Sequence, residues 1–444
     1  MAAINKPIVF RCERQWLEFL TQSGIDIPFT DDLSVLSTPV SIGPKTAHNR
    51  ILYQPMEGCD GTLDGRPGLL TRRRYARYAA GGPGVIWLEA VAVCQEGRAN
   101  PRQLWLNEQT LDEFKSLILS IKSTCSVEHG FEPLVILQLT HSGRYSKPEG
   151  VPAPLIAYNN PLFEPFPIDS SHIMSDDQLK ELEEVFGFAA QLAERAGADG
   201  VDIKCCHRYL LSELLSAYDR EGDYGGSFDN RTRLLRNAVV SAQASTHSCL
   251  ITTRLNLYDG FPYPYGFGVR AGNGIEPDYR EGIALCKLLH ERYGLPLINV
   301  TIGNPYVNPH VNRPSNTKKN LSIEQPLTGV ERILGASAAL KKAVPSLLAA
   351  CSGLSYLRQF IATTAAAMIK EQRADFVGLG RASYADPKIA SELVTGHPLE
   401  ENKCCICCGK CSELMRAGSV AGCVIRDSET YLPYYKKYVL NKEN

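Results

Sequence analysis

Short apolar runs rich in β-branched residues recur along the chain, and amphipathic stretches separate them. Runs of this length are typical of buried β-strands, and strands that alternate with helices favour a parallel sheet. Eight runs are predicted to be strands: residues 51–56, 85–93, 134–139, 200–205, 250–255, 297–302, 347–351 and 376–380. Eight strands, each followed by a helix-forming segment, predict a (β/α)8 TIM barrel, with a doubly wound open sheet as the alternative.

Residues 176–196 illustrate the helical part of this repeat. Apolar residues follow i, i+3 and i+4 spacing after a start at Ser175 and Asp176, residue types that commonly begin helices. The stripe consists of Leu179, Leu182, Val185, Phe186, Ala189 and Leu192. We expect this stripe to pack on the wall of the barrel.

The repeat divides the chain into three parts. Residues 1–34 precede it and predict an N-terminal extension, residues 35–397 form the predicted barrel, and residues 398–444 form a cysteine-rich tail. The N-terminus lacks the uninterrupted apolar core of a signal peptide, and no window has the length of a membrane span. We therefore expect a cytoplasmic protein.

Composition narrows the classes of function. The 444 residues are 44% hydrophobic and 21% charged, which is ordinary for a soluble chain with a sizeable core. The net charge is −1 without basic or acidic runs, so small-molecule chemistry is favoured over binding to nucleic acid or membrane surfaces. The fifteen cysteines, several of them clustered in the tail, indicate reduced thiols rather than a disulfide framework.

Four cysteines in the tail follow the spacing Cys-x2-Cys-x3-Cys-x11-Cys, namely Cys404, Cys407, Cys411 and Cys423. Three thiolates from one short loop and a fourth from a later segment suit an iron–sulfur cubane. A zinc site remains the alternative, although zinc more often uses two separated Cys-x2-Cys pairs. The same loop contains Cys405 and Cys408, which permit a shifted frame that shares Cys411.

Polar residues concentrate at the predicted strand ends, the face that carries active sites in TIM barrels. The last two strands end in small-residue turns, whose backbone N–H groups can approach a phosphate. In chain order the strand-end residues include Pro55, Met56, Glu57, Ala90, Gln138, Lys204, His207, Tyr209, Arg254, Ser352, Gly353, Gly380 and Arg381.

Several of these residues belong to motifs that resemble the Old Yellow Enzyme family of flavin oxidoreductases. The motifs are Gln138-Leu-Thr-His-Ser-Gly-Arg144, His207-Arg-Tyr209, Asp223-Tyr-Gly-Gly-Ser-Phe-Asp-Asn-Arg231 and Gly378-Leu-Gly-Arg381. The resemblance covers residues 35–397. The cysteine tail extends it to the iron–sulfur subgroup that includes 2,4-dienoyl-CoA reductase and enoate reductases. The spacing of the first cysteine frame agrees with that subgroup, so we prefer it to the shifted frame.

The resemblance implies FMN in the barrel and assigns residues to each part of it. Arg254 would lie near N1 and O2 of the flavin, where a cation stabilises the reduced ring. The remaining assignments are Pro55, Met56, Glu57 and Ala90 beside the ring, Gln138 at its pyrimidine edge, and Ser352, Gly353, Gly380 and Arg381 at the phosphate.

The resemblance also implies a reaction in which hydride passes from flavin N5 to the β-carbon of an activated alkene. Tyr209 would protonate the α-carbon, because a tyrosine with a pKa of about 10 stays protonated at neutral pH. His207 matches one member of the pair that polarises the substrate carbonyl.

Two positions depart from the family pattern. The first member of the carbonyl-binding pair is commonly histidine, and here it is Lys204. We hypothesise that its ammonium favours a substrate with developing enolate or carboxylate charge. Glu57 stands where some relatives carry cysteine or threonine, which puts the usual tuning of the flavin potential in question.

The expected function is reduction of the C=C bond of an α,β-unsaturated carbonyl compound, an enoate or an enoyl thioester, with electrons relayed through a 4Fe–4S cluster. The alternatives are an oxidative reaction, including amine oxidation as in trimethylamine dehydrogenase, and a non-catalytic barrel with structural zinc.

The electron donor is a separate question, because an FAD and nicotinamide domain follows the barrel in multidomain relatives and this chain ends at Asn444. We favour an external donor, either a separate FAD/NADH-binding subunit or a ferredoxin. Direct reduction of FMN by NAD(P)H is a second hypothesis, and a third is that the sequence is a piece of a longer protein. A homo-oligomer is one option for the assembly.

Overall fold

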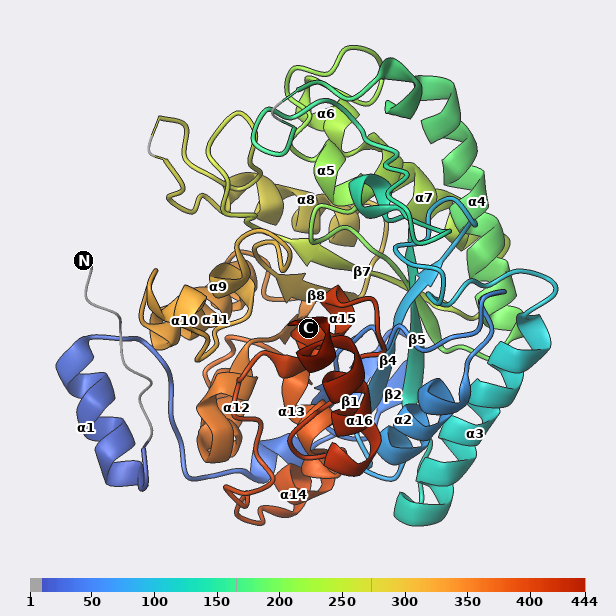
Figure 1. The fold of residues 1–444 in the computed structure, drawn as a ribbon. Coiled ribbons are helices and arrows are strands. Elements are labelled where there is room, and N and C mark those ends of the chain that lie inside the picture. The colour runs from blue at the N-terminus through green and yellow to red at the C-terminus, as the bar shows by residue number, and fades with distance from the viewer. Residues whose placement is uncertain (1–9, 165, 273, 444) are drawn as a thin grey trace.

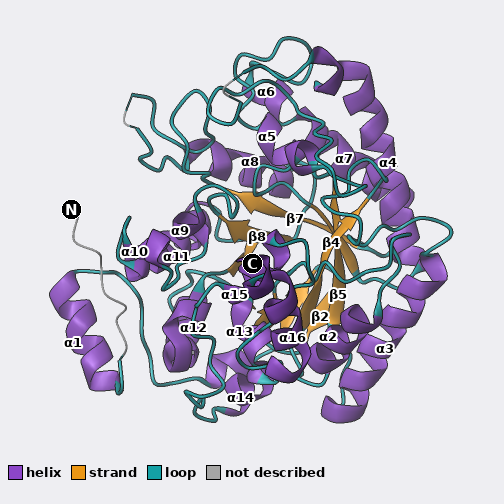
Figure 2. Ribbon diagram, in the orientation of Figure 1, coloured by secondary structure: helices purple, strands orange, loops and turns teal. Residues whose placement is uncertain are grey.

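A closed barrel of eight parallel strands forms the centre of the molecule (Figure 2). The computed structural model describes residues 10–164, 166–272 and 274–443. The barrel strands are β3 (Ile51–Tyr53), β4 (Val85–Ala92), β5 (Leu134–Thr140), β6 (Gly200–Ile203), β7 (Leu250–Asn256), β8 (Leu297–Thr301), β9 (Leu348–Cys351) and β10 (Phe376–Leu379). Because β10 pairs with both β9 and β3, the predicted (β/α)8 barrel is confirmed and the open sheet is excluded.

Helices surround the barrel on its outer side (Figure 1). The longer ones are α2 (Leu69–Ala79), α3 (Leu111–His129), α4 (Asp176–Arg195), α7 (Arg233–Ser245), α8 (Arg280–Glu291), α11 (Pro326–Ala343), α12 (Ile361–Lys370) and α14 (Ile389–Thr395). Shorter turns are α5 (Leu210–Leu214), α6 (Phe228–Arg231), α9 (Pro309–Asn312), α10 (Lys318–Leu321), α13 (Arg381–Ala385), η1 (Ser34–Ser37), η2 (Gly143–Tyr145), η3 (Ser170–His172) and η4 (Leu354–Phe360).

Helix α4 begins where the sequence predicted it. The Ser175 hydroxyl oxygen accepts the backbone N–H of Gln178 at 3.2 Å, and the Gln178 side chain accepts the N–H of Ser175 at 2.9 Å. This reciprocal capping box satisfies two N–H groups that a helix start otherwise leaves unpaired. Leu179, Leu182 and Phe186 are buried, so the predicted stripe does pack inward.

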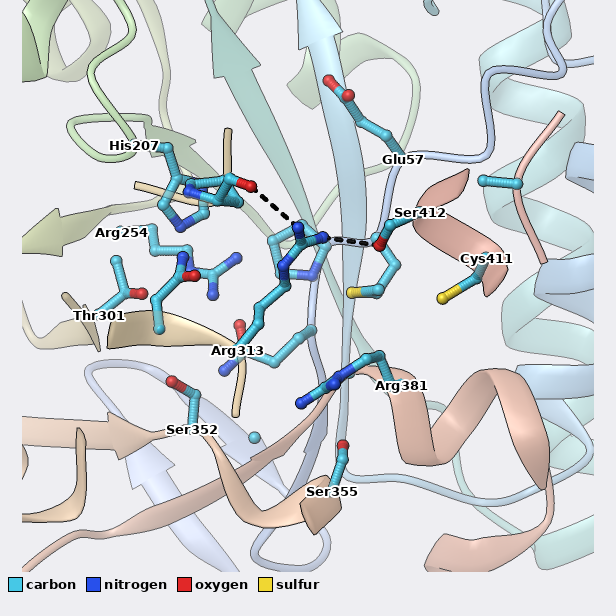
Figure 3. Close-up of a pocket in the computed structure, with 18 of the residues that line it drawn as sticks. Glu57, His207, Arg254, Thr301, Arg313, Ser352, Ser355, Arg381, Cys411 and Ser412 are labelled. Carbon is cyan, nitrogen blue, oxygen red and sulfur yellow. Dashed lines mark hydrogen bonds between the residues drawn. The ribbon is translucent and has the colours of Figure 1, made fainter. Parts of the chain in front are cut away.

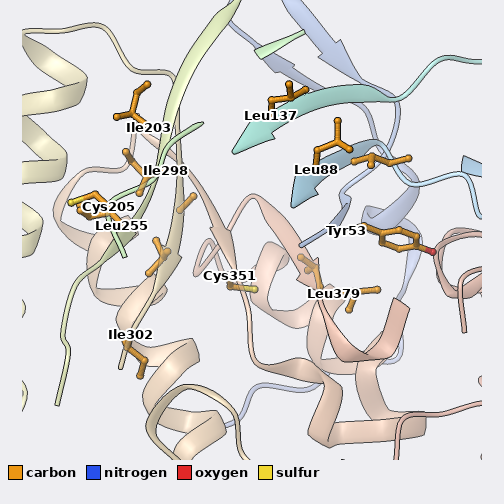
Figure 4. Close-up of a cluster of buried hydrophobic side chains, with 14 of the residues drawn as sticks. Tyr53, Leu88, Leu137, Ile203, Cys205, Leu255, Ile298, Ile302, Cys351 and Leu379 are labelled. Carbon is orange, nitrogen blue, oxygen red and sulfur yellow. The ribbon is translucent and has the colours of Figure 1, made fainter. Parts of the chain in front are cut away.

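The main hydrophobic core lies between the strands and the surrounding helices. Figure 4 shows side chains from successive strands meeting there, including Leu88, Leu137, Ile203 and Leu255. A second apolar cluster lies at the amino ends of the strands, where the antiparallel hairpin β1 (Val40–Ile42) and β2 (Lys45–Ala47) packs against their first residues. The hairpin covers this end of the barrel, so the carboxyl ends of the strands are the face where a site can form.

The segment before the hairpin contains helix α1 (Glu13–Ser23), which packs on the outside of the barrel. Trp16 is buried and its ring stacks on Phe360, with the ring centroids 5.6 Å apart. Asp26 forms an ion pair with Arg373 at 2.8 Å. Residues 1–9 of the predicted N-terminal extension lie outside the described residues. None of the helices in the described ranges is long and apolar enough to cross a membrane.

The C-terminal tail contains α15 (Lys410–Arg416), α16 (Ser428–Tyr438) and η5 (Leu440–Glu443), drawn in red in Figure 1. Leu414, Val420, Val424 and Tyr431 contribute to a small core of its own. Asp427, directly before α16, forms ion pairs with Arg73 at 2.6 Å and with Arg77 at 2.5 Å, both on α2. These contacts hold the tail against the barrel and place its cysteine loop near the strand ends.

A buried arginine on α2 supports the loop that follows β3. Arg74 forms ion pairs with Asp60, at 2.5 Å, and with Glu89, and all three side chains are almost fully buried. Glu89 in turn accepts the backbone N–H of Gly58 at 2.8 Å. Loss of the guanidinium would leave two carboxylates buried without their cation.

Arg74→Met is therefore expected to lower the free energy of unfolding by about 3–5 kcal/mol. Urea unfolding followed by circular dichroism measures this. Arg72→Met is the matched control, because Arg72 pairs with Glu113 at a partly exposed position, where such a pair contributes about 1 kcal/mol or less. Equal destabilisation by the two variants would contradict the assigned role of Arg74.

Candidate active site

One cavity opens at the carboxyl ends of the barrel strands and collects residues from both the barrel and the tail (Figure 3). Every predicted catalytic residue lines it, together with all but one of the predicted cofactor residues. The lining includes Lys204, His207, Tyr209, Pro55, Met56, Glu57, Gln138, Arg254, Ser352, Gly353, Gly380 and Arg381. Ala90 is the exception: it is buried within β4, and its carbonyl oxygen accepts the side-chain N–H of Gln103 at 3.2 Å.

The turn after β6 presents His207 and Tyr209 to the cavity. His207 and Arg208 both have left-handed backbone conformations, with φ of 63° and 57°, which cost about 1–3 kcal/mol each for residues other than glycine. The buried guanidinium of Arg208 holds the turn through Asp259 and Ser216, each at 2.9 Å.

The imidazole of His207 is neutral in this environment. Its Nε2 atom is buried and has no hydrogen-bond partner among the described residues. Burial, reinforced by the positive charges of Arg254 and Lys204, holds the pKa of His207 well below its usual value. A neutral imidazole with an unused ring nitrogen is suited to hydrogen-bond a ligand in the cavity.

Tyr209 lies at the centre of a small polar network. Its hydroxyl and that of Tyr306 are 2.7 Å apart, and it donates to the carboxylate of Glu57 at 3.4 Å. The Nζ atom of Lys204 lies 3.5 Å from the centroid of the Tyr209 ring. Burial, together with the charge of Glu57, raises the pKa of Tyr209 well above its usual value, so the phenol keeps its proton.

Three arginines line the cavity without an acidic partner. Among the described residues, no carboxylate forms an ion pair with Arg254, Arg313 or Arg381. Arg313 donates to Ser412 and to the carbonyl of Pro305, each at 2.9 Å. Burial, with Arg381 as a positive neighbour, lowers the pKa of Arg313 to about 10. Asp202 acts on Arg254 at longer range, but buried guanidinium groups without an ion-pair partner are costly, so this arrangement is suited to an anionic ligand.

Arg313 projects into the middle of the cavity from the segment between β8 and α11 (Figure 3). Sequence analysis missed this residue, because the segment carries no recognisable motif. Tyr306 and Ser355 were missed for the same reason. Their contribution depends on how the loops fold over the strand ends.

Asp202 orients the amide of Gln138 inside the barrel. Gln138 Nε2 donates to Asp202 at 2.6 Å, and the same carboxylate accepts the indole N–H of Trp87 at 2.8 Å. This bond uses one of the two amide hydrogens of Gln138 and fixes the side chain at the wall of the cavity.

A second, larger cavity of about 600 Å³ adjoins the first, which has about 150 Å³ open. Glu57, Tyr306 and Met415 line both cavities. Arg102 and Lys147 also line the larger one, which includes residues of the loop after β5 and of the tail. Tyr209 does not line the larger cavity, but Glu57 and Tyr306, which both contact the Tyr209 hydroxyl, do.

The cysteine loop surrounds a third cavity next to Arg381. Its lining includes Cys405, Cys407, Cys408, Cys411 and Cys423. Cys404 is not among the residues that line it. Cys411 also lines the first cavity. Among the described residues, no group of three or more His, Cys, Asp or Glu side chains has the arrangement of a metal site.

Comparison with known proteins agrees with this architecture. The chain is 34% identical over 212 residues to an NADPH dehydrogenase of Bacillus pumilus, a match that covers 46% of this chain and 58% of the relative, less than two thirds of its length. Among solved structures, a 2-naphthoyl-CoA reductase complex superposes with a TM-score of 0.72 at 20% identity, covering 88% of this chain and 57% of that one. Histamine dehydrogenase from Rhizobium sp. 4-9 superposes with a TM-score of 0.65 at 19% identity, covering 89% and 53%.

Identities this low between structures establish the shared fold only. The family assignment comes from the sequence of the barrel itself. Residues 35–264 match the NADH:flavin oxidoreductase / NADH oxidase family, in agreement with the resemblance in the motifs. The chain therefore belongs to the NADH:flavin oxidoreductase / NADH oxidase family.

Proposed function

We propose that this protein is an FMN-dependent ene-reductase that reduces the C=C bond of an α,β-unsaturated carbonyl compound. One observation carries the proposal: a protonated tyrosine, a neutral histidine and three arginines without acidic partners line the same cavity at the active face of the barrel. The family membership supports flavin chemistry at this face.

The residues of the cavity fit FMN at both of its ends. Arg313 and Arg381, with the turn at Gly353 and Gly380, would hold the phosphate, because a dianion suits two guanidinium groups without carboxylate partners. Gly353 has a φ of +96°, and a Cβ atom there would approach Ile333 to 3.0 Å, so this turn requires glycine. Arg254 and the side chain of Gln138 would hold the flavin ring.

When bound, FMN supplies the hydride for the β-carbon of the substrate. His207 and Lys204 donate hydrogen bonds to the substrate carbonyl oxygen, and the ammonium of Lys204 stabilises the enolate charge that develops there. Tyr209 then donates its proton to the α-carbon. A Lys204→His variant with unchanged kinetics on both neutral and carboxylate-bearing enones would exclude this role for Lys204.

We further propose that the tail, residues 398–444, binds a 4Fe–4S cluster through Cys405, Cys408, Cys411 and Cys423. These thiols line the third cavity, whereas Cys404 does not. The sulfur of Cys405 accepts the N–H of Cys407 at 3.4 Å, and that of Cys423 accepts the N–H of Arg426 at 3.3 Å. Hydrogen bonds of this kind to sulfur are a feature of cluster ligands.

Cys407 lines the same cavity but is assigned a different role. Its Sγ contacts the backbone carbonyl oxygen of Ser355 at 3.5 Å and lies 3.9 Å from Cys405 Sγ, whose hydrogen bond lowers the pKa of Cys407. Its φ of 51° is left-handed, which turns the loop between Cys405 and Cys408. The proposed ligands therefore include Cys405 and Cys408 in place of Cys404 and Cys407, the two that the spacing favoured.

The cluster, when bound, supplies single electrons, and Cys411 places one of its ligands at the wall of the proposed flavin site. The electrons come either from a separate FAD/NADH-binding subunit or ferredoxin, or from NAD(P)H acting on the flavin directly. Oxidation of an amine is the second candidate function, supported by the likeness in fold to histamine dehydrogenase. The protonated state of Tyr209 favours proton donation, and so reduction.

An anaerobic visible spectrum before and after stepwise addition of dithionite tests this proposal, with iron, zinc and acid-labile sulfide assayed on the same sample. We expect flavin bands over a broad absorbance near 400 nm and about four iron atoms per chain. Bleaching of the oxidised flavin by an added amine would favour the second candidate. A colourless protein that contains zinc would overturn both.

A further inference from the structure

We infer that Glu57 delivers protons to Tyr209, so that the proton donor is reloaded from the second cavity after each turnover. The inference rests on the proposed ene-reductase function. Tyr209 is 1% exposed, and burial together with the negative charge of Glu57 disfavours its phenolate. A phenolate formed by protonation of the substrate therefore has to regain a proton, and bulk water does not reach it directly.

Glu57 stands between Tyr209 and the larger cavity. Its Oε1 atom accepts a hydrogen bond from the Tyr209 hydroxyl at 3.4 Å and another from Gln103 Nε2 at 3.2 Å. It lines both cavities, and among the described residues it is the only carboxylic acid that lines either one. Figure 3 shows Glu57 across the cavity from Arg381, away from the proposed phosphate position.

The surroundings of Glu57 are suited to proton exchange. Burial raises its pKa above that of an ordinary carboxyl group, while the charges of Lys204 and Lys147 oppose the shift. Tyr209, Tyr306, Cys59 and Glu89 are its other titratable neighbours. A carboxyl group displaced toward neutral pH both gives and takes protons more readily than one at its usual pKa.

Tyr306 is the competing relay, because it also touches Tyr209 and lines both cavities. Burial and the charge of Glu57 raise its pKa well above that of an ordinary phenol. A phenol of this kind is a weak acid and reloads a neighbouring phenolate slowly. Glu57 is therefore the better source of the proton.

Tyr209 and Glu57 each give up and regain one proton in every turnover. The substrate gains one hydride at the β-carbon, whose electrons come from NAD(P)H or another reductant, and one proton at the α-carbon from the Tyr209 O–H group. The Glu57 carboxyl then gives its proton to the Tyr209 phenolate. Water in the second cavity protonates the Glu57 carboxylate, and the hydroxide that remains is neutralised by buffer.

Rapid-mixing kinetics of the Glu57→Gln holoenzyme test the inference, with 2-cyclohexenone as the substrate probe. Tyr209 begins each experiment protonated, so we expect a burst of one product per active site and then a steady state slowed by about 10²-fold. Formate added to Glu57→Ala should restore the later turnovers, because a small acid can occupy the vacated space. Glu149→Gln, at an exposed carboxylate on the loop after β5, is the control and should match the wild type.

The alternative outcomes are distinct. Equal slowing of the burst and the steady state would mean that Glu57 acts on the flavin or on the transfer itself, and would overturn the inference. Unchanged kinetics in both phases would also overturn it, as would slow later turnovers in Tyr306→Phe but not in Glu57→Gln. Absence of enone reduction by the wild type would instead reject the proposed function.

Discussion

Replacing Cys405 by serine is expected to abolish the iron–sulfur cluster, whereas replacing the adjacent Cys404 is expected to leave it intact. Cys405 lines the cavity beside Arg381, and Cys404 does not. The variant would hold the cubane through three thiolates only, and the serine hydroxyl is a weaker ligand than the thiolate that it replaces. Iron should therefore fall from about four atoms per chain toward zero. Iron and sulfide assays measure this, with electron paramagnetic resonance of the dithionite-reduced protein as an independent readout.

Cys404 and Cys405 provide a matched pair of variants, because the same substitution is made at two adjacent residues. Cys408→Ser should behave as Cys405→Ser does, and Cys407→Ser should keep the cluster. If Cys404→Ser and Cys407→Ser lose iron while Cys405→Ser and Cys408→Ser retain it, the unshifted frame holds. Loss of iron in all four variants would overturn the exclusion of Cys404. Circular dichroism of each variant separates loss of a ligand from loss of the fold.

Replacing Tyr209 by phenylalanine is expected to lower kcat for enone reduction by about 10²–10⁴-fold. The substitution removes the proton donor and the hydrogen bonds to Tyr306 and Glu57, but it keeps the ring against which Lys204 packs. Stopped-flow spectroscopy separates reduction of the flavin by the electron donor from its reoxidation by the enone. We expect only the second step to be slowed.

Tyr224→Phe is the control for this experiment. Its hydroxyl donates to Glu183 at 2.7 Å on the outer layer of helices, and it lines neither of the two cavities that meet at Tyr209. The Tyr224→Phe variant should therefore lose little activity. If the enone reoxidised the reduced flavin of Tyr209→Phe at the wild-type rate, Tyr209 would not be the proton donor. That result would favour the oxidative alternative.

The barrel could be predicted from the sequence because the patterns that indicate its strands and helices are local. Each strand is a short apolar run, and each helix carries its own stripe and start residues, as Ser175 and Asp176 show for α4. The candidate site could be predicted for a related reason: Gln138 and Arg254 lie in the second halves of β5 and β7, and Tyr209 lies in the turn after β6. A parallel barrel brings all of its strand ends to one face, so the position of a residue along its strand predicts its place in space.

Other features depend on contacts between segments that are distant in the sequence. Arg313 reaches the cavity from a loop without a motif, and Arg74 pairs with carboxylates on two other elements. The hairpin β1–β2 falls outside the eightfold repeat, so no sequence pattern predicted that it covers the amino ends of the barrel strands.

The amino-acid sequence alone therefore determined the barrel, the family and about half of the residues that line the cavity, because short-range patterns encode strands and strand ends. The tertiary structure decided which cysteines face a common space and that Glu57 connects two cavities. Spacing favours the frame that begins at Cys404 but also permits the shifted one, because it does not determine which side chains of a short loop face inward. The proposed choice between the frames rests on tertiary features, namely the left-handed turn at Cys407 and its contact with Ser355.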